Sequence, residues 1–356
     1  MVVDDSVVIR RLVSGVLDGD PALRVVGTAA NGRLALAKLN QLAPDLVTLD
    51  IEMPEMDGLE TLRELRKTHP RLPVIMFSTL TERAAKATLE ALALGANDYV
   101  AKPANVGSVA AGMESVRSQL VPKIKALCAA RLPAGPPRAA APALRPRATP
   151  VRTTAATTPE VLAVGCSTGG PEALARVLKA LPAALPVPVV VVQHMPPVFT
   201  AMFAQRLDAQ CALRVREAVD GDVLEPGLVL IAPGGLHMTV RRAGRRSVVR
   251  LDQSAPENWC RPAVDPMFRS VTAAYGPAAL AVVLTRMGQD GLRGAERLVE
   301  AGAAVIVQDA ATSVVWGMPG AVADAGLASQ VLPLPRIAEA VLRALPAART
   351  AAAVGS

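Results

Sequence analysis

Residues 161–174, VLAVGCSTGGPEAL, change from an apolar run into a turn of small residues and then into the start of a helix. Ser167 lies at the tip of that turn, between Gly165 and Gly169. Glycines at this spacing permit a sharp strand-to-helix turn that exposes a serine hydroxyl, as a nucleophilic serine requires. A serine just before a helix that opens with proline and glutamate is also an ordinary N-cap. The stretch therefore predicts a strand followed by a helix, and it leaves nucleophile and cap open for Ser167.

Short apolar runs alternate with amphipathic helical segments along most of the chain, which is typical of an α/β protein with parallel sheets. Before residue 132 the predicted strands are LRVVGTAA (23–30), LVTLD (46–50), VIMFS (74–78) and DYVAKP (98–103). After residue 160 they are VLAVGCS (161–167), VPVVVVQH (187–194), ALAVVLT (279–285) and AAVIVQD (303–309). A hairpin-like segment, VRRAGRRSVVRL (240–251), interrupts this second series.

Residues 132–160 lack helical or strand periodicity and are rich in Pro, Ala, Arg and Thr, which indicates an extended linker. A chain of 356 residues is long enough to form a domain with its own core on each side. The boundaries that we predict are a first domain over residues 1–120, a linker over 121–158, a second domain over 159–348 and a tail over 349–356. Because aromatic residues make up only 2% of the chain, both cores must consist mainly of Ala, Val and Leu.

The distribution of charge argues against several classes of protein. The net charge is +7, but residues 115–159 contain eight Lys or Arg and no acid, which leaves 30 of the 38 basic residues against 31 acids elsewhere. No helix-turn-helix, RRM or aromatic-interleaved basic patch accompanies this segment, so we expect no nucleic-acid partner. No apolar run approaches the roughly 20 residues of a membrane span, and no signal peptide is visible, so we expect a cytoplasmic protein without membrane insertion. The four cysteines form no C-x-x-C pair, which fits reduced thiols.

Carboxylates follow two predicted strands of the first domain. Asp4 and Asp5 come after an apolar pair, and Asp50 ends LVTLD. Because the carboxyl ends of parallel strands share one edge of a sheet, these acids can converge there, and clustered hard oxygen ligands suit Mg²⁺. Ser78 and Lys102 end two later strands, where a hydroxyl and an ammonium could bind the oxygens of a phosphoryl group. Any one of these acids could equally be a solvated loop residue.

A nucleophilic Ser167 needs a base and an acid that orients the base. Two histidines follow the linker, His194 and His237. His194 ends VPVVVVQH and reaches the edge where Ser167 lies if the two strands are parallel neighbours, whereas His237 begins an alternating segment and is interpreted as structural. Asp290, in GQDG after another apolar strand, could hold the imidazole in the correct tautomer. A structural histidine and a helix N-cap remain the alternatives for His194 and Asp290.

Residues 1–105 resemble the receiver domain of two-component response regulators through VVDDS, LVTLDIEMPEMDG, VIMFST and DYVAKP. The resemblance implies a flavodoxin-like fold with a five-stranded parallel sheet, in which Asp50 accepts a phosphoryl group from a histidine kinase of the chemotaxis type. It also implies that Asp4, Asp5 and Asp50 bind the Mg²⁺ that phosphorylation requires. The switch residues that it implies are Ser78, Tyr99 and Lys102.

The second domain resembles the chemotaxis protein-glutamate methylesterase family, CheB. The resemblance rests on VGCSTGGPEAL, VVVVQHMP, IAPGGLHM, PAVDPMF, GQDG and SVVWGMPGAV, in this order behind a receiver and a linker. It implies an α/β doubly wound, mainly parallel-sheet serine hydrolase with Ser167 as nucleophile, His194 as general base and Asp290 as its orienter. The implied reaction removes methyl esters from glutamate, and deamidates glutamine, on methyl-accepting chemotaxis receptors without a cofactor. Inhibition by the receiver, relieved on phosphorylation, is implied as well.

The oxyanion of an acyl-transfer intermediate needs backbone N–H donors, for which we consider Gly169, Gly170 and Met287. Two positions near this site depart from the family pattern. Arg286 precedes Met287 where the family often has glycine, and Cys260 stands where many members have histidine. A role tied to that histidine therefore does not carry over to this chain.

Three other interpretations use the same residues differently. A serine esterase could combine Ser167 with Asp222 and His237 in the chain order of α/β-hydrolases. Cys166 could be the nucleophile in place of the neighbouring serine. A non-enzymatic response regulator could bind a nucleotide phosphate at GCSTGG, although the sequence lacks the lysine of a P-loop and the full G-x-G-x-x-G spacing.

Overall fold

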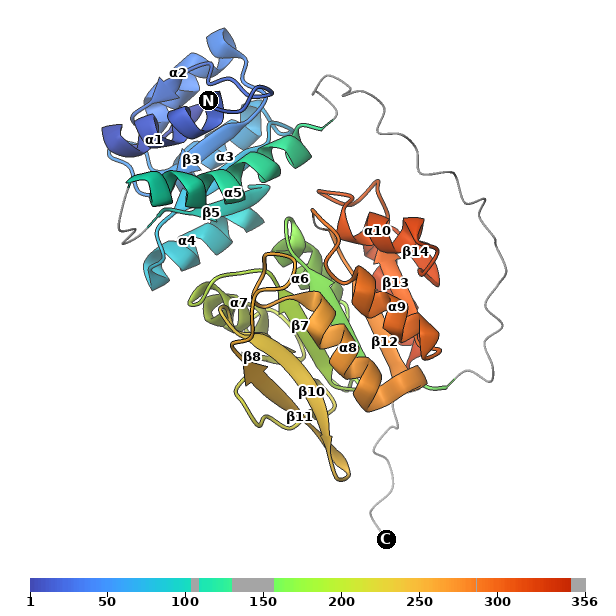
Figure 1. Cartoon of the computed structure of the whole chain (residues 1–356). Helices are drawn as coiled ribbons and strands as arrows, with labels where there is room; N and C mark the ends of the chain where they lie inside the picture. Colours follow the sequence, from blue (N-terminus) through green and yellow to red (C-terminus); the bar gives the residue numbers. More distant parts are fainter. Residues whose placement is uncertain (104–108, 130–156, 286, 347–356) are drawn as a thin grey trace. The chain divides into compact units, whose positions relative to one another are not determined.

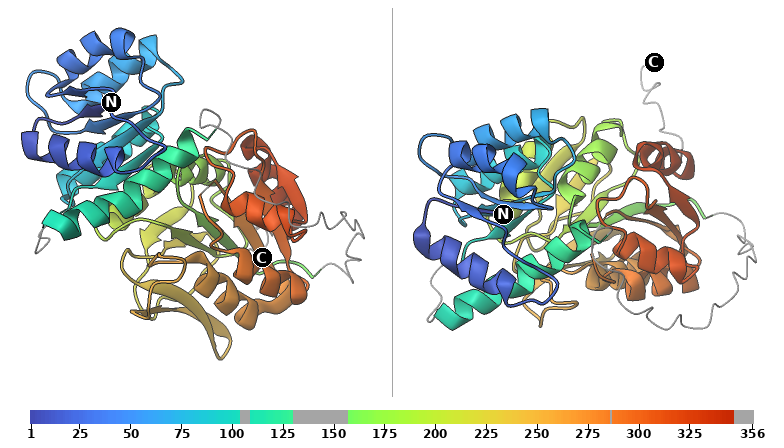
Figure 2. Two further views of the ribbon diagram at one scale, coloured as in Figure 1. Left: turned by 45° about the horizontal axis from the view of Figure 1, so that its top comes forward. Right: turned by 90° about the horizontal axis from the view of Figure 1, so that it is seen from above.

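The computed structural model describes residues 1–103, 109–129, 157–285 and 287–346. The chain divides into two compact units, Met1–Leu144 and Arg145–Ser356, and each is built on a parallel sheet with helices on both faces (Figure 1; Figure 2). Most of the predicted linker and all of the predicted tail lie outside the described residues. None of the helices in the described ranges is long and apolar enough to cross a membrane.

Within its described residues, the first unit is a five-stranded sheet flanked by helices. Its elements are β1 (Val2–Val3), α1 (Val7–Asp18), β2 (Thr28–Ala29), α2 (Gly32–Leu42), β3 (Val47–Asp50), α3 (Gly58–Thr68), β4 (Val74–Ser78), α4 (Glu82–Ala93), β5 (Asp98–Ala101) and α5 (Val109–Leu127). The strand order is β2-β1-β3-β4-β5, and every pair is parallel. α1 packs against α5, and α3 packs against α2 and α4. The predicted flavodoxin-like fold is confirmed.

Two elements of the first unit differ in length from the prediction. The strand predicted over residues 23–30 is reduced to Thr28–Ala29, because its partner β1 itself offers only two residues for pairing. α5 continues to Leu127, beyond the predicted domain end at residue 120. Its Val121 and Ile124 side chains belong to the apolar core of this unit. The receiver fold therefore includes residues that the sequence interpretation assigned to the linker.

The second unit contains a seven-stranded sheet and a separate two-stranded hairpin. Its main elements are β6 (Val161–Cys166), α6 (Gly170–Lys179), β7 (Val189–Gln193), α7 (Phe199–Asp208), β8 (Arg214–Glu217), β9 (Leu228–Ile231), β10 (His237–Ala243), β11 (Arg246–Asp252), α8 (Val264–Tyr275), β12 (Ala279–Val283), α9 (Leu292–Glu300), β13 (Ala304–Gln308), α10 (Met318–Asp324), β14 (Gln330–Leu332) and α11 (Leu334–Ala344).

The seven strands run in the order β14-β13-β12-β6-β7-β9-β8 with parallel pairs throughout. The chain enters at the central β6, extends the sheet through β7 to β9 and β8, and then returns to build β12, β13 and β14 on the other side. Ligands of such sheets bind outside the carboxyl ends of the strands, where the direction of winding changes. This point lies at β6, and Ser167 comes directly after that strand. The doubly wound fold and the hairpin of β10 with β11 are both confirmed.

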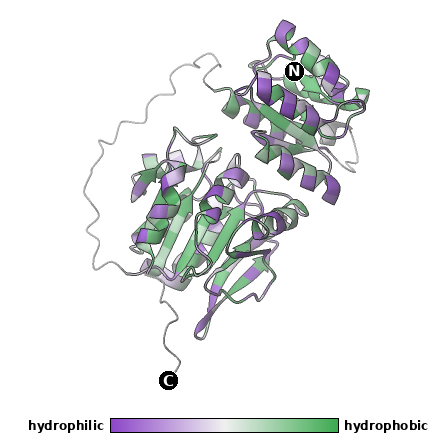
Figure 3. Cartoon of the chain, turned by 180° about the vertical axis from the view of Figure 1, so that it is seen from behind, coloured by the Kyte–Doolittle hydropathy of each residue, from purple (hydrophilic) through white to green (hydrophobic). Residues whose placement is uncertain are grey.

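The central strands form the core of the second unit. Every residue of β6, β7 and β12 is buried. Because helices cover both faces of a parallel sheet, its central strands are apolar throughout rather than alternating. Figure 3 shows these hydrophobic strands inside the unit and hydrophilic residues on the outer faces of the helices. The loops that follow these strands are therefore attached to a closely packed sheet.

Candidate active site and phosphoacceptor site

Ser167 lies directly after β6, in the turn that leads into α6. Its backbone N–H donates to Thr285 O at 3.3 Å, and its carbonyl oxygen accepts from Gly170 N at 2.6 Å and from Gln193 Nε2 at 3.0 Å. The N-cap of α6 is Gly169, and no side chain caps the helix. The helix-cap interpretation of Ser167 therefore does not hold. The backbone fixes the serine, and its half-buried side chain is available for chemistry.

Gly169 makes the sharp turn after the serine possible. Its φ is +71°, and a Cβ atom at this position would lie 2.5 Å from Val314 Cγ2. A side chain would thus be strained by the backbone and blocked by its neighbour. Among the described residues, no acceptor is bound to the N–H of Gly169, whereas the N–H of Gly170 is engaged by Ser167 O. Of these two predicted oxyanion donors, Gly169 has an N–H available to bind an oxyanion, whereas the N–H of Gly170 is already bonded.

His194 follows β7 and lies beside the serine turn. Cys166 of β6 pairs with Gln193 of β7, so Ser167 and His194 are the next residues on neighbouring strands. The Nε2 atom of His194 lies 2.8 Å from Asp290 Oδ2. The other ring nitrogen, Nδ1, is buried and has no hydrogen-bond partner in the described part of the chain. Because a carboxylate can only accept, Nε2 carries the proton and Nδ1 carries the lone pair that a base needs.

Asp290 lies in the loop between β12 and α9, and its side chain is fully buried. Oδ2 accepts from Val264 N at 2.7 Å in addition to His194, while Oδ1 accepts from Asp265 N and Gly291 N at 3.0 Å. Val264 and Asp265 begin α8, so the carboxylate occupies the positive end of that helix. These charge-assisted bonds offset the cost of burying the carboxylate and fix its orientation. The N-cap interpretation of Asp290 does not hold, because Gly291 is the N-cap of α9.

Two further residues hold this site together and were not predicted. Asn258 Nδ2 donates to Asp290 Oδ1 at 2.8 Å. The Thr285 hydroxyl donates to Thr168 O at 3.1 Å and accepts from Val315 N at 3.0 Å, which ties the serine turn to the loop after β13. Thr285 could have been found, because it is a polar residue at the carboxyl end of a predicted central strand. Asn258 gave no such signal, because it lies between two of the quoted motifs, IAPGGLHM and PAVDPMF, in a segment without helical or strand periodicity.

The remaining predicted positions are Met287, Arg286 and Cys260. Met287 is half-buried in the loop between β12 and α9. Arg286, the departure that precedes it, lies outside the described residues. Cys260, the second departure, is partly exposed and exchanges two backbone hydrogen bonds with Glu257, at 3.0 and 3.1 Å.

The rival triad of Ser167, Asp222 and His237 does not form within the described residues. His237 is buried, with Nε2 at 3.1 Å from Ala255 O and Nδ1 accepting from Ala263 N at 3.2 Å, so its structural interpretation is confirmed. The Asp222 carboxylate pairs instead with a guanidinium on β8.

Cys166 is also unsuited to be the nucleophile. Its side chain is buried in β6, and its sulfur lies 3.7 Å from Val192 O. Burial raises the pKa of the thiol, which disfavours the reactive thiolate.

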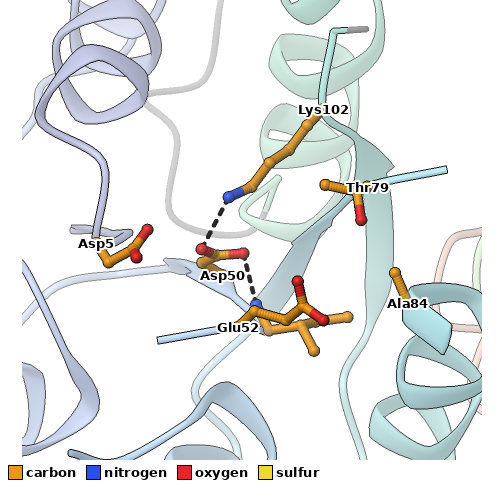
Figure 4. A pocket seen from close by; sticks show the side chains of 7 residues that line it. Asp5, Asp50, Glu52, Thr79, Ala84 and Lys102 are labelled. Carbon is orange, nitrogen blue, oxygen red and sulfur yellow. Dashed lines mark hydrogen bonds and ion pairs between the residues drawn. The ribbon is translucent and has the colours of Figure 1, made fainter. Parts of the chain in front are cut away.

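The predicted phosphoacceptor residues meet at the edge of the first sheet (Figure 4). Asp50 ends β3, Asp4 and Asp5 follow β1, and one carboxylate oxygen of each lies within 4.8 Å of the others. Lys102 Nζ lies 2.9 Å from Asp4 Oδ2 and 2.8 Å from Asp50 Oδ2. Figure 4 shows the ammonium of Lys102 pointing at Asp50, with Asp5 on the other side of that carboxylate. Hard carboxylate oxygens in this arrangement are the ligands that Mg²⁺ prefers, so the residues fit that ion.

The charges of this site are unevenly balanced. Burial raises the pKa of Asp50 to about 6, and the negative charge of Asp4 adds to the rise, although the hydrogen bond from Lys102 opposes it. Burial alone would lower the pKa of Lys102, but its hydrogen bonds to Asp4 and Asp50 raise it overall, so this amine stays charged. One ammonium among three carboxylates leaves a net negative site that a cation would stabilise.

Ser78 ends β4 but does not line the pocket in front of Asp50. Its hydroxyl donates to Thr79 O at 3.2 Å and accepts from Thr88 Oγ1 at 2.9 Å. Thr79, which the sequence interpretation did not single out, lines the pocket instead (Figure 4). In this state the Ser78 hydroxyl is therefore held by α4, and phosphate sensing by Ser78 stays a prediction.

Tyr99 is buried between β5 and α5. Lys123 Nζ donates to Tyr99 O at 2.7 Å and lies 5.3 Å from the centroid of its ring. The same ammonium pairs with Asp98 Oδ1 at 2.9 Å. Burial, with a smaller contribution from Asp98, raises the pKa of the Tyr99 phenol. The predicted switch aromatic thus points inward, and it is held by a residue beyond the predicted end of the domain.

Comparison with known proteins places both units in families. Residues 162–341 match the family described as CheB methylesterase, and residues 1–113 match the response regulator receiver domain. The chain is 57% identical over 349 residues to a protein-glutamate methylesterase/protein-glutamine glutaminase of Nocardioides, with 97% of this chain and 94% of that protein covered. It is 50% identical over 344 residues to a protein of the same name from Trichodesmium erythraeum, with 96% and 97% covered. The crystal structure of the Thermotoga maritima CheB methylesterase catalytic domain matches 52% of this chain and 98% of that chain, at 41% identity and a TM-score of 0.51. Behind its receiver domain, this chain therefore belongs to the CheB methylesterase family.

Proposed function

We propose that this chain hydrolyses methyl esters of glutamate on the signalling helices of methyl-accepting chemotaxis receptors, with Ser167 as the nucleophile. The observation that carries the proposal is the 2.8 Å hydrogen bond between His194 Nε2 and Asp290 Oδ2, which leaves Nδ1 of the imidazole for the serine. The relatives are named as methylesterases and glutaminases, which supports the same reaction. Deamidation of glutamine uses the same site, with ammonia in place of methanol as the leaving group.

The reaction begins with proton transfer, because a neutral serine hydroxyl is a weak nucleophile. His194 Nδ1 takes the proton of Ser167 as Oγ attacks the ester carbonyl, and Asp290 stabilises the resulting imidazolium. The backbone N–H of Gly169 faces the oxyanion with that of Met287, and each such donor contributes about 3 kcal/mol. The imidazolium then protonates the departing methoxide, and methanol leaves. Water, deprotonated by the same imidazole, then attacks the acyl-enzyme, and the imidazolium returns a proton to Ser167 Oγ as the free glutamate leaves.

We propose that Asp50 accepts a phosphoryl group from a histidine kinase of the chemotaxis type. Asp4, Asp5 and Asp50 would hold Mg²⁺, which when bound supplies positive charge that offsets the charge of the phosphoryl oxygens. Lys102, already directed at Asp50, binds one of those oxygens. The esterase reaction uses no cofactor in this proposal. Both the kinase and the receptor signalling helices lie in the cytoplasm, which is where we place this protein.

Release of methanol from methylated receptor tests the nucleophile. Ser167→Ala should lower the rate by several orders of magnitude, because the attacking oxygen is removed. It should keep the fold, because this side chain caps no helix. Cys166→Ala is the matched control one residue away, and it should keep most of the activity. Turnover of Ser167→Ala within tenfold of the unaltered protein would refute the assignment.

A further inference from the structure

A two-residue turn lies against the carboxylate of Asp290. Glu257 and Cys260 exchange backbone hydrogen bonds across the turn, and both carboxylate oxygens of Glu257 accept from Arg269 of α8 at 2.7 Å. The two residues between them, Asn258 and Trp259, have φ values of +52° and +64°. This left-handed backbone costs energy for residues with a side chain, and such strain is concentrated at functional sites.

The side chain of Asn258 joins two buried acids. Its Nδ2 donates to Asp290 Oδ1 at 2.8 Å and to Asp265 Oδ2 at 2.9 Å. The two acidic residues are 0% and 1% exposed, so water does not screen the repulsion between them. Burial raises the pKa of Asp265, and the negative charge of Asp290 adds to that rise. The Asn258 amide therefore lies between two carboxylates and donates to both of them.

We infer that Asn258 is a positioning residue for the esterase reaction, because its amide holds Asp290 so that Oδ2 faces His194. Of the three described donors to Oδ1, Asn258 makes the shortest bond, at 2.8 Å against 3.0 Å for Asp265 N and Gly291 N. With Oδ1 occupied in this way, Oδ2 is the oxygen that the imidazole meets. The inference rests on the proposed function, since it assigns Asn258 to the same site.

Asn258→Gly separates positioning from folding. Glycine adopts a φ of +52° without strain, and the bonds of Glu257 to Arg269 and Cys260 still hold the turn. We therefore expect the turn to form as before, although the melting temperature should fall slightly, because two buried carboxylates lose the donor that they share. The kcat for methanol release should fall about ten- to a hundredfold, as for loss of a hydrogen bond to a charged group. The KM should stay within twofold, because Asn258 does not touch the substrate.

Trp259→Gly is the matched control. Trp259 has the same left-handed backbone in the same turn and is fully exposed, but it gives no donor to either acid. The substitution relaxes the turn to the same degree. Its kcat should stay within twofold of the unaltered protein.

Asn258→Asp adds a readout that a purely structural role would not produce. The charged groups that face this position are Asp265 and Arg269 of α8, Glu257 of the turn, Asp290, and His194 at the end of β7. A third carboxylate among these acids should be more damaging than glycine at pH 8. At lower pH its protonated form again offers an O–H donor, so its kcat relative to the unaltered protein should rise between pH 8 and pH 6.

The assays use the full chain and methylated receptor, with Ser167→Ala in parallel. If the unaltered protein is no faster than Ser167→Ala, the proposed function fails. If only the unaltered protein is active, but Asn258→Gly keeps kcat within twofold, the positioning role is wrong. An equal loss of kcat in Trp259→Gly would also overturn it, because the backbone of the turn would then be responsible.

Discussion

At the scale of single residues, two buried carboxylates are placed in opposite electrostatic environments. Asp290 receives backbone N–H groups at the positive end of α8, and these stabilise the negative charge of its carboxylate. Asp50 is buried beside Asp4, and its pKa rises to about 6. The first arrangement suits an acid that stabilises an imidazolium in every turnover. The second suits an acid that binds a cation or accepts a phosphoryl group.

Asp290→Asn should be severely damaging although it is nearly isosteric. The amide can present its NH₂ to His194, which stabilises the wrong tautomer and leaves no lone pair for Ser167, so we expect kcat to fall about 10³- to 10⁴-fold. Methanol release from methylated receptor measures this. The control is Asp222→Asn, an acid that pairs with Arg216 away from the imidazole. Near-normal activity of Asp290→Asn together with a loss in Asp222→Asn would favour the rival triad.

Binding of Mg²⁺ to the receiver should depend on pH through Asp50. A carboxyl whose pKa lies near 6 is mostly protonated at pH 5 and mostly ionised at pH 7, and only the ionised form attracts a cation. Affinity should therefore rise about tenfold from pH 5 to pH 7 and then level off. Isothermal titration calorimetry measures this dependence. In Asp50→Asn the binding should be weak and flat with pH, and a flat profile for the unaltered receiver would contradict the assignment.

The neighbouring positions of Ser167, His194 and Asp290 could be predicted because each follows an apolar run, and parallel strands bring such positions to one edge. Asn258 could not be found in this way. It reaches Asp290 from a turn, and no periodicity predicts where an irregular segment folds back. The sequence also could not predict the direction in which a side chain points. Ser78 ends its strand as expected, yet its hydroxyl bonds to residues of α4 and of the adjoining loop.

At the scale of elements, α5 shows why a boundary predicted from the sequence can be too short. Pro122 lies inside the helix and argues against helical continuation in the sequence, because proline removes a backbone donor. The apolar positions around it nevertheless keep helical spacing, and Val121, Ile124 and Cys128 are all buried. Packing against the rest of the receiver overrides the local preference.

This packing gives a stability prediction for isolated receiver fragments. Fragment 1–120 should be at least about 3 kcal/mol less stable to urea than fragment 1–129, because each fully buried apolar side chain contributes about 1.5–3 kcal/mol. Fragment 1–120 also loses Lys123, which bonds to Tyr99 and Asp98. The control is Lys125→Ala in the longer fragment, where loss of a partly exposed ion pair with Asp20 should change the stability much less than the truncation does. Equal stability of the two fragments would show that residues 121–129 are dispensable.

At the scale of the whole molecule, each unit has an apolar core of its own. The esterase residues come from β6, β7, β12 and the segment before α8, all in the second unit. The phosphoacceptor residues come from the first unit alone. The two sites are thus encoded in separate folds, and we expect any communication between them to be a shift in the populations of two states of the chain.

We expect the receiver to inhibit the esterase and phosphorylation of Asp50 to relieve the inhibition. A chain without residues 1–150 should therefore release methanol faster than unphosphorylated full-length protein. Tenfold stimulation needs only about 1.4 kcal/mol, within the usual range of coupling free energies.

Full-length Asp50→Asn should keep the basal rate and fail to respond to acetyl phosphate with Mg²⁺. Asp57→Asn, which keeps a side chain able to cap α3, should respond normally. If the isolated second unit were no faster than the unphosphorylated full-length protein on the same methylated receptor, inhibition by the receiver would be excluded.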